Sequence, residues 1–141
     1  MNKFQYPALL KPNNEGGFIV SFRDVPEVIT EIWSQEELLS TAQDALLTGI
    51  DIYFEKRKLF PMPSALKKGE VAIPLSLTVN AKILLLNTMV EGNIRPSDLA
   101  KKMGITPQEV NRVIDLFHKT KIDTIQSAIK ALGKDFLLTI I

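Results

Sequence analysis

The stretch RPSDLAKKMGITPQEVNRVID, residues 95–115, decides how the second half of the chain folds. It is typical of two short helices joined by a tight turn at Gly104, where a positive φ costs glycine almost nothing. Thr106 and Glu109 form a capping-box pattern, and Pro107 falls at the first position of the second helix. Five apolar residues have spacings that point them inward, namely Leu99, Met103, Ile105, Val110 and Val113. The combination predicts a DNA-binding helix-turn-helix; the alternative is a helical hairpin that packs on the rest of the chain and touches no nucleic acid.

The second helix of this pair carries the residues expected to read DNA. Gln108, Asn111 and Arg112 are not needed for the core, and glutamine and asparagine pair with adenine whereas arginine pairs with guanine. Phosphate contacts are expected from four further residues, namely Thr106, Lys101, Lys102 and Lys119. The alternative for each lysine is an ordinary solvated helix face. A dimer would place two such helices about one DNA turn apart, which predicts an operator with an inverted repeat.

Composition and charge narrow the class of protein. The 141 residues are 45% apolar and 23% charged, as expected of a folded protein, and the absence of cysteine excludes disulfides and thiolate metal sites. Residues 1–76 carry a net charge of −2 and residues 77–141 of +3, so the basic excess lies in the half that holds the helix pair. The start of the chain is not typical of a signal peptide, and no apolar run is long enough for a membrane span. We therefore expect a soluble, cytoplasmic protein.

The first half mixes strands with one helix. Alternating apolar residues predict strands over 3–10, 18–22 and 28–33. Ser34 with Glu37 predicts a capped helix, and a last strand over 70–75 is limited to an edge or a strand end by Pro74. The resulting order, β-β-β-α-β, indicates a small sheet with a helix on one face, so the fold class is α+β.

The second half is predicted to be helical up to its last residues. A helix over 78–91 ends at Gly92, the helix pair follows, and a last helix over about 122–132 ends at Gly133. Residues 136–141 are short, apolar and β-prone. We expect this strand to pair with its copy in a second subunit through Phe136, Leu138 and Ile140, giving a dimer or tetramer; the alternative is a strand that returns to the local core.

The order of motifs along the chain resembles the HicB-type antitoxins. In the first half the resemblance rests on Gly16-Gly17-Phe18-x-Val20, on the helix that reaches Asp44-Ala45-Leu46, and on Val71-x-Ile73-Pro74-Leu75-Ser76. In the second half it rests on Thr120-Lys121-Ile122-Asp123-Thr124-Ile125-Gln126 and Ala131-Leu132-Gly133-Lys134. Two turns depart from the family pattern, since Val25-Pro26-Glu27 replaces the common Leu-Pro-Gly and Thr30-Glu31-Ile32 the common Thr-x-Gly.

The resemblance implies a two-domain antitoxin. Residues 1–76 would form a partial RNase H-like domain that binds the toxin, and residues 77–141 a helix-turn-helix domain that binds DNA, oligomerises and ends in the short strand. The implied function is to neutralise a small, mRNA-cleaving HicA-type ribonuclease toxin and to repress the operon that encodes both proteins. An acidic face suits a partner with a basic, RNA-binding surface. The residues expected to contact the toxin are Glu31, Trp33, Glu36, Glu37 and Asp44; for Trp33 the alternative is packing over the edge of its own sheet.

No constellation of residues predicts catalysis. A two-metal nuclease needs several carboxylates that converge on one site, whereas the acids of the first half fall in turns and on helix positions that suit solvent. The chain has one histidine, His118, and no cysteine, so its composition does not predict a metal site. No cofactor is expected. Two other functions stay open: a stand-alone transcriptional regulator whose N-terminal domain senses a ligand or dimerises, and a metal-dependent nuclease.

Overall fold

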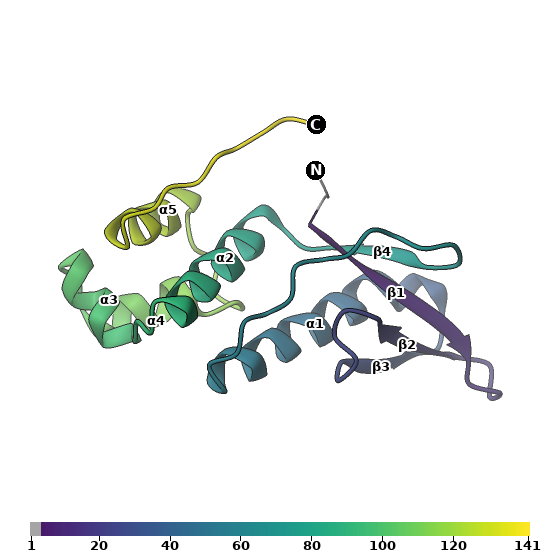
Figure 1. Cartoon of the computed structure of the whole chain (residues 1–141). Coiled ribbons are helices and arrows are strands. Elements are labelled where there is room, and N and C mark those ends of the chain that lie inside the picture. Colours follow the sequence, from purple (N-terminus) through teal and green to yellow (C-terminus); the bar gives the residue numbers. More distant parts are fainter. Residues whose placement is uncertain (1–3) are drawn as a thin grey trace. The chain divides into compact units, whose positions relative to one another are not determined.

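The computed structural model describes residues 4–141 and shows an α+β chain with a four-stranded antiparallel sheet and five α-helices (Figure 1). The described residues divide into two compact units. The first unit consists of the chain up to Glu55 together with Phe60–Leu75, and the second of Lys56–Leu59 together with Ser76–Ile141. The sheet and one helix belong to the first unit, and the other four helices belong to the second.

Four short strands make the sheet of the first unit. They are β1 (Gln5–Pro12), β2 (Phe18–Phe22), β3 (Ile29–Ile32) and β4 (Val71–Pro74), in the spatial order β3-β2-β1-β4. All three pairings are antiparallel, with Leu10 opposite Val20 and Tyr6 opposite Ile73. The predicted order β-β-β-α-β is confirmed, and β4 is an edge strand that ends at Pro74, as the proline requires.

Helix α1 (Leu38–Glu55) packs against this sheet and buries its apolar stripe. The strand residues that the alternation directs inward are fully buried, among them Tyr6, Val20, Ile32 and Ile73. They meet the buried residues of α1, which are Ala42, Leu46, Gly49 and Ile50. At Gly49 an added Cβ would clash with a Val28 methyl group, so the glycine lets the helix come close to the segment before β3.

The start of the helical region differs from the predicted capping box. A 3₁₀ turn, η1 (Gln35–Glu37), precedes α1, and the side chain of Ser34 makes no capping hydrogen bond. The Glu37 carboxylate instead accepts the backbone N–H of Trp33 at 2.9 Å, while the Glu37 N–H donates to the Ser34 carbonyl at 3.2 Å. That backbone bond closes a three-residue turn, which is the 3₁₀ geometry and leaves the serine hydroxyl unused.

The second unit is built from α2 (Leu77–Glu91), α3 (Pro96–Met103), α4 (Pro107–Ile114) and α5 (Ile122–Ala131). The predicted helices are confirmed within a few residues at each end. Ser76 caps α2 by accepting the Val79 N–H at 3.2 Å, and Gly92 ends that helix. The core of the unit holds fully buried residues from every helix, namely Leu85, Leu99, Val110 and Ile125.

The expected C-terminal strand is not formed in the described chain. Residues 135–141 have no regular secondary structure, and the chain runs on past α5 as an extended tail (Figure 1). A strand exists only when its backbone groups pair with a neighbouring strand. Within residues 4–141 the four strands of the sheet pair only with one another, so residues 136–141 form no strand within one chain, and their pairing with a copy in a second subunit stays a prediction.

Candidate functional sites

The turn between α3 and α4 has the backbone geometry that Gly104 and the capping pattern at Thr106 predict. Gly104 ends α3 with φ of 68°, a left-handed conformation that suits a residue without Cβ. Thr106 then caps α4: its hydroxyl accepts the N–H of Glu109 at 3.2 Å, and the Glu109 carboxylate accepts the N–H of Thr106 at 2.8 Å. The capping box and the proline at the first position of α4 are thus confirmed. The turn sets α4 firmly against α3.

Helix α4 presents a polar face to solvent. Val110 and Val113 are buried, whereas Gln108, Asn111 and Arg112 are exposed. Among residues 4–141, no hydrogen bond or ion pair engages the side-chain polar groups of these three residues. Glutamine, asparagine and arginine are the side chains that form paired hydrogen bonds with base edges, so this face is chemically able to read a DNA groove.

The residues expected to contact phosphate lie around this face but differ in their engagement. Lys101 and Lys102 are exposed in the last turn of α3, and Lys119 is exposed in the segment that follows α4. Thr106 is exposed as well, yet its hydroxyl already serves the cap with Glu109 at 3.2 Å. The lysine ammonium groups are therefore more available to phosphate than the Thr106 hydroxyl.

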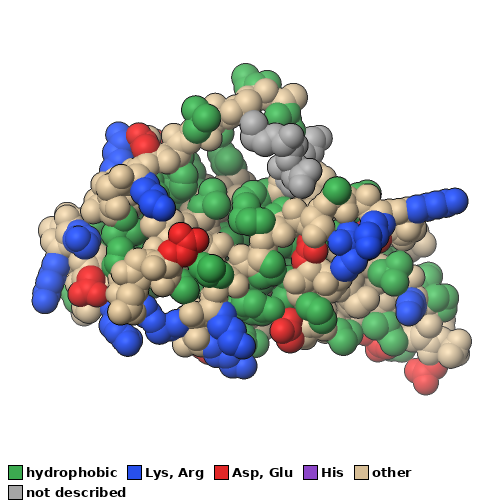
Figure 2. Space-filling view, in the orientation of Figure 1, with side chains coloured by type: hydrophobic (Ala, Val, Ile, Leu, Met, Phe, Trp, Pro, Cys, Tyr) green, Lys and Arg blue, Asp and Glu red, His purple; other side chains and the backbone are tan. Residues whose placement is uncertain are grey.

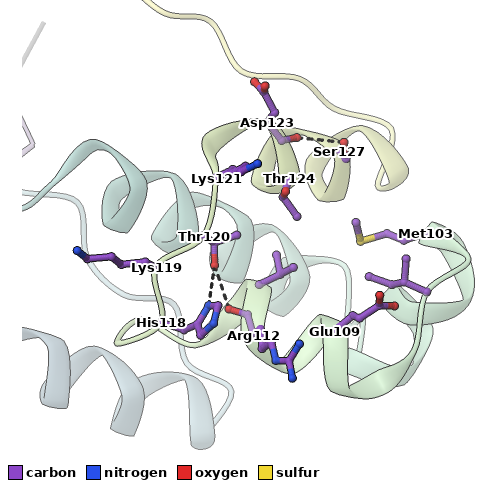
Figure 3. A pocket seen from close by; sticks show the side chains of 12 residues that line it. Met103, Glu109, Arg112, His118, Lys119, Thr120, Lys121, Asp123, Thr124 and Ser127 are labelled. Atoms are coloured by element: carbon purple, nitrogen blue, oxygen red, sulfur yellow. Dashed lines mark hydrogen bonds between the residues drawn. The ribbon is translucent and has the colours of Figure 1, made fainter.

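A surface groove of about 580 Å³ runs beside α4 and extends to α5 (Figure 3). Arg112 and Glu109 line it from α4, Met103 closes one end from α3, and Thr120 lies where the connecting segment passes. The lining mixes both charges with apolar atoms. His118 Nδ1 lies 3.3 Å from the Thr120 hydroxyl, which also hydrogen-bonds the Lys82 ammonium and the Arg112 carbonyl. No group of three or more histidine, aspartate or glutamate side chains within residues 4–141 could hold a metal ion.

Lys82 is a buried residue that the sequence pattern did not predict as part of this site. It lies on the core-facing side of α2 and is 1% exposed. Its ammonium donates to the carbonyl oxygens of Asp115 and His118, each at 2.6 Å, and to the Thr120 hydroxyl at 2.8 Å. Burial lowers the pKa of Lys82, and the charge of Asp115 opposes that shift. A single cation among the apolar residues of the helix predicted over 78–91 was the signal available in the sequence.

The residues expected to contact a partner gather in part on the edge strand β3. Glu31 lies on β3, where its carboxylate accepts the Asn13 side-chain N–H at 3.1 Å, and Trp33 follows directly. The indole is 52% exposed and packs over Gly17, where an added Cβ would come within 2.7 Å of Cε3. Glu36 and Glu37 lie in the next turn, whereas Asp44 is on α1, farther along the chain.

Two exposed apolar side chains on β2 and β3 were not predicted as part of this surface. Ile29 is 63% exposed and Ile19 41% exposed. In the strand register Ile19 lies opposite Glu31, and Ile29 lies opposite Ser21, so both share the sheet face of Glu31, away from α1. Isoleucine at outward positions of neighbouring strands was the signal in the sequence, but the register was needed to bring the two together.

The C-terminal tail is the most exposed apolar segment of the described chain. Leu137 is 91% exposed, Leu138 77%, Ile140 97% and Ile141 73%, whereas Phe136 is only partly exposed. The space-filling view shows apolar side chains along this segment at the top of the picture (Figure 2). No helix in the part of the chain that the structure covers is long and apolar enough to cross a membrane.

Comparison with known proteins relates this chain to one family. Residues 5–84 match the family model described as "HicB_like antitoxin of bacterial toxin-antitoxin system". The match covers the whole sheet, α1 and the start of α2.

Curated relatives extend the similarity to the rest of the chain. "Antitoxin HicB" of Escherichia coli (strain K12) is 43% identical over 137 residues, which is 97% of this chain and 99% of the relative. "Antitoxin HicB 1" of Photorhabdus laumondii is 40% identical over 140 residues, 99% of this chain and 89% of the relative. "Antitoxin HicB" of Pseudomonas fluorescens is 30% identical over 138 residues, 97% of this chain and 94% of the relative.

Proposed function

The chain belongs to the HicB-like family of antitoxins of bacterial toxin–antitoxin systems, and we propose that it silences a HicA-type ribonuclease toxin by direct binding and represses its own operon. In this proposal residues 1–76 form a partial RNase H-like, toxin-binding domain. Residues 77–141 form a helix-turn-helix domain that binds operator DNA in the cytoplasm. The observation that carries the proposal is the similarity to curated antitoxins over nearly the whole chain, both units included.

The α3–α4 pair supports the DNA-binding part of the proposal. Gln108, Asn111 and Arg112 share the exposed face of α4 and make no side-chain hydrogen bond within residues 4–141, so they are available to base edges. The exposed lysines on either side supply the sequence-independent attraction to phosphate on which affinity depends. A homo-oligomer would place two such helices on an inverted repeat, with Thr106, Lys101, Lys102 and Lys119 nearest the backbone.

The toxin-binding surface is proposed to centre on β3. This strand lies at the edge of the sheet and carries Glu31, with Ile29 on the same face and Trp33 at its end. An aromatic anchor surrounded by apolar and acidic side chains suits a basic protein partner. Glu36, Glu37 and Asp44 would extend the acidic surface around this centre.

The tail supports self-association. Residues 136–141 are extended and apolar, with backbone groups that lack a neighbouring strand within the described chain. A segment of this kind pairs readily with an identical copy, because each tail supplies the edge that the other needs. We assign Phe136, Leu138 and Ile140 to this seam between subunits.

Co-expression with a HicA-type toxin tests the proposed function. The wild-type chain is expected to restore growth and to co-purify with the toxin. Trp33→Ala and Glu31→Lys are expected to weaken the complex by about 1–3 kcal/mol each, measured by calorimetry on purified proteins. The matched control is Glu55→Lys, because Glu55 is exposed at the end of α1, away from β3 along the chain.

Other outcomes would favour the remaining functions. Membership of an antitoxin family suggests a regulatory, non-enzymatic role, so purified protein is expected to cleave no RNA with magnesium or manganese. Cleavage that disappears on mutating acidic residues would favour a nuclease. A chain that binds its promoter yet neither binds nor silences a toxin would be a stand-alone regulator.

A further inference from the structure

A buried cation joins α2 to the segment that follows α4. The ammonium of Lys82 has three short hydrogen bonds, to the Asp115 carbonyl at 2.6 Å, the His118 carbonyl at 2.6 Å and the Thr120 hydroxyl at 2.8 Å. An ammonium has three protons to donate, so these acceptors use its full capacity. The carbonyl of Arg112 lies farther away, at 3.3 Å.

Thr120 extends this connection back into α4. Its hydroxyl accepts from Lys82 and donates to the Arg112 carbonyl at 3.2 Å, and Nδ1 of His118 lies 3.3 Å from it (Figure 3). The Arg112 carbonyl belongs to the last turn of α4, where helix carbonyls lack partners in the helix itself. Lys82 and Thr120 together cap the C-terminal end of α4 from outside the helix, where a positive charge also suits the helix dipole.

The buried charge of Lys82 costs free energy that an apolar side chain at the same position would not. Burying an ammonium is unfavourable unless its hydrogen bonds are complete, and a methionine would fill the same space with no such demand. The segment 115–120 contains no helix or strand, so its path depends on the few ties that it has. Three of its residues, Asp115, His118 and Thr120, are tied directly to Lys82.

We propose that Lys82 is a positioning residue for DNA binding: by capping α4 and tying down residues 115–120, it sets the placement of Arg112 and Lys119 against the duplex. This inference rests on the proposed DNA-binding function. Arg112 lies in the last turn of α4, and the exposed Lys119 stands between the tied residues His118 and Thr120. Without the hydrogen bonds to Lys82, both cations would still be present, but the backbone that carries them would no longer be held in one position.

The test uses two pairs of variants in the full-length chain. Lys82→Met keeps the apolar stem and removes the donor, and Lys82→Arg keeps a cation of different shape. Thr120→Val removes the hydroxyl with little change of volume. Thr120→Ser keeps the hydroxyl and is the matched control. Promoter DNA of the chain's own operon is the probe in fluorescence anisotropy over a range of salt concentrations. Amide hydrogen exchange reports on residues 112–120, and thermal unfolding confirms that each variant is folded.

The expected results separate positioning from a general loss of structure. At a temperature where the variant is folded, Lys82→Met should weaken promoter binding about tenfold, because hydrogen bonds to a charged group are lost. The slope of binding against salt should fall by about one for each phosphate contact that becomes disordered. Amides of residues 112–120 should exchange faster, Thr120→Val should act in the same direction, and Thr120→Ser should behave as wild type.

Two results would overturn the inference, and a third concerns only its premise. Folded Lys82→Met with the promoter affinity and salt slope of wild type would show that Lys82 only stabilises the unit. If Lys82→Met does not fold, Thr120→Val decides, and wild-type affinity in that variant overturns the positioning role. A wild-type chain that binds no promoter DNA would instead overturn the DNA-binding function, since the comparison between variants presupposes it.

Discussion

Both carboxylate oxygens of Asp24 hold Ser64. Oδ1 lies 2.6 Å from the Ser64 hydroxyl oxygen, and Oδ2 lies 2.7 Å from its backbone nitrogen. Asp24 follows β2, and Ser64 lies in the irregular connection between α1 and β4, 40 residues later. The pair therefore fixes the long connection between α1 and β4 to the end of β2 within the first unit.

Asp24→Ala should lower the free energy of unfolding by about 1–3 kcal/mol, because the partly buried Ser64 groups lose their acceptor. Urea denaturation followed by circular dichroism measures the change. The control is Asp44→Ala at an exposed position of α1, which should stay within about 0.5 kcal/mol of wild type. Equal stability of the two variants would mean that the connection does not depend on Asp24.

A second tie to the same connection predicts a dependence on pH. Arg23 donates to both oxygens of Glu70, at 3.1 and 2.9 Å, and this contact lowers the pKa of Glu70 below its ordinary value of 4.5. A carboxylate with a lowered pKa stabilises the fold above its unfolded pKa and loses that effect as the pH falls through its folded pKa. Wild type should therefore be more stable than Glu70→Gln above pH 4.5, with the difference shrinking at lower pH.

Urea titrations from neutral pH down into the acid range check this behaviour. Glu55→Gln, at an exposed position, should run parallel to wild type throughout. A constant gap between wild type and Glu70→Gln across the whole range would contradict the proposed role of the ion pair.

The turn between α3 and α4 should tolerate asparagine better than alanine at Gly104. The φ of 68° is unfavourable for alanine, and no atom lies within 4 Å of an added Cβ, so the cost comes from the backbone alone. Gly104→Ala should lose about 1–2 kcal/mol of stability. Gly104→Asn should lose less, because asparagine adopts this conformation more readily. Thermal unfolding compares the two, and an equal loss would indicate a packing effect instead.

Arg112 and Lys102 should affect DNA binding in different ways. If Arg112 reads a base, Arg112→Ala should weaken operator binding by about 1–3 kcal/mol and relax the preference at one base position. If Lys102 contacts phosphate, Lys102→Ala should weaken binding to all sequences alike and reduce the salt slope by about one. Anisotropy with operator and scrambled duplexes separates the two effects. Unchanged affinity in Arg112→Ala would remove Arg112 from the interface.

If residues 136–141 form the proposed seam between subunits, their deletion should shift the protein toward the monomer. The deleted segment carries four large side chains that are at least 73% exposed, and burying them between subunits would be the main gain from association. Light scattering coupled to size exclusion measures the mass of both forms. A truncated chain that keeps the mass of the full-length protein would place the seam elsewhere.

Local patterns predicted most of the secondary structure. Gly104, Thr106 with Glu109, Pro107 and Gly133 act on the backbone within a few residues, so their effect is visible in the sequence, and the structure confirms it. The capping box at Ser34 failed because Glu37 found a different local partner, the N–H of Trp33. The local sequence pattern does not distinguish the N–H of Ser34 from the N–H of Trp33 as the partner of the Glu37 carboxylate.

The sequence by itself determined the family, the order of the elements and the polar face of α4. Only the tertiary structure decided that Lys82 is buried, that Ile19 and Ile29 share the sheet face of Glu31, and that residues 136–141 find no strand to join. The first group depends on periodicity and on caps, which act between neighbours in the chain. The second depends on contacts between residues tens of positions apart, such as Lys82 with His118, whose partners exist only once the chain has folded.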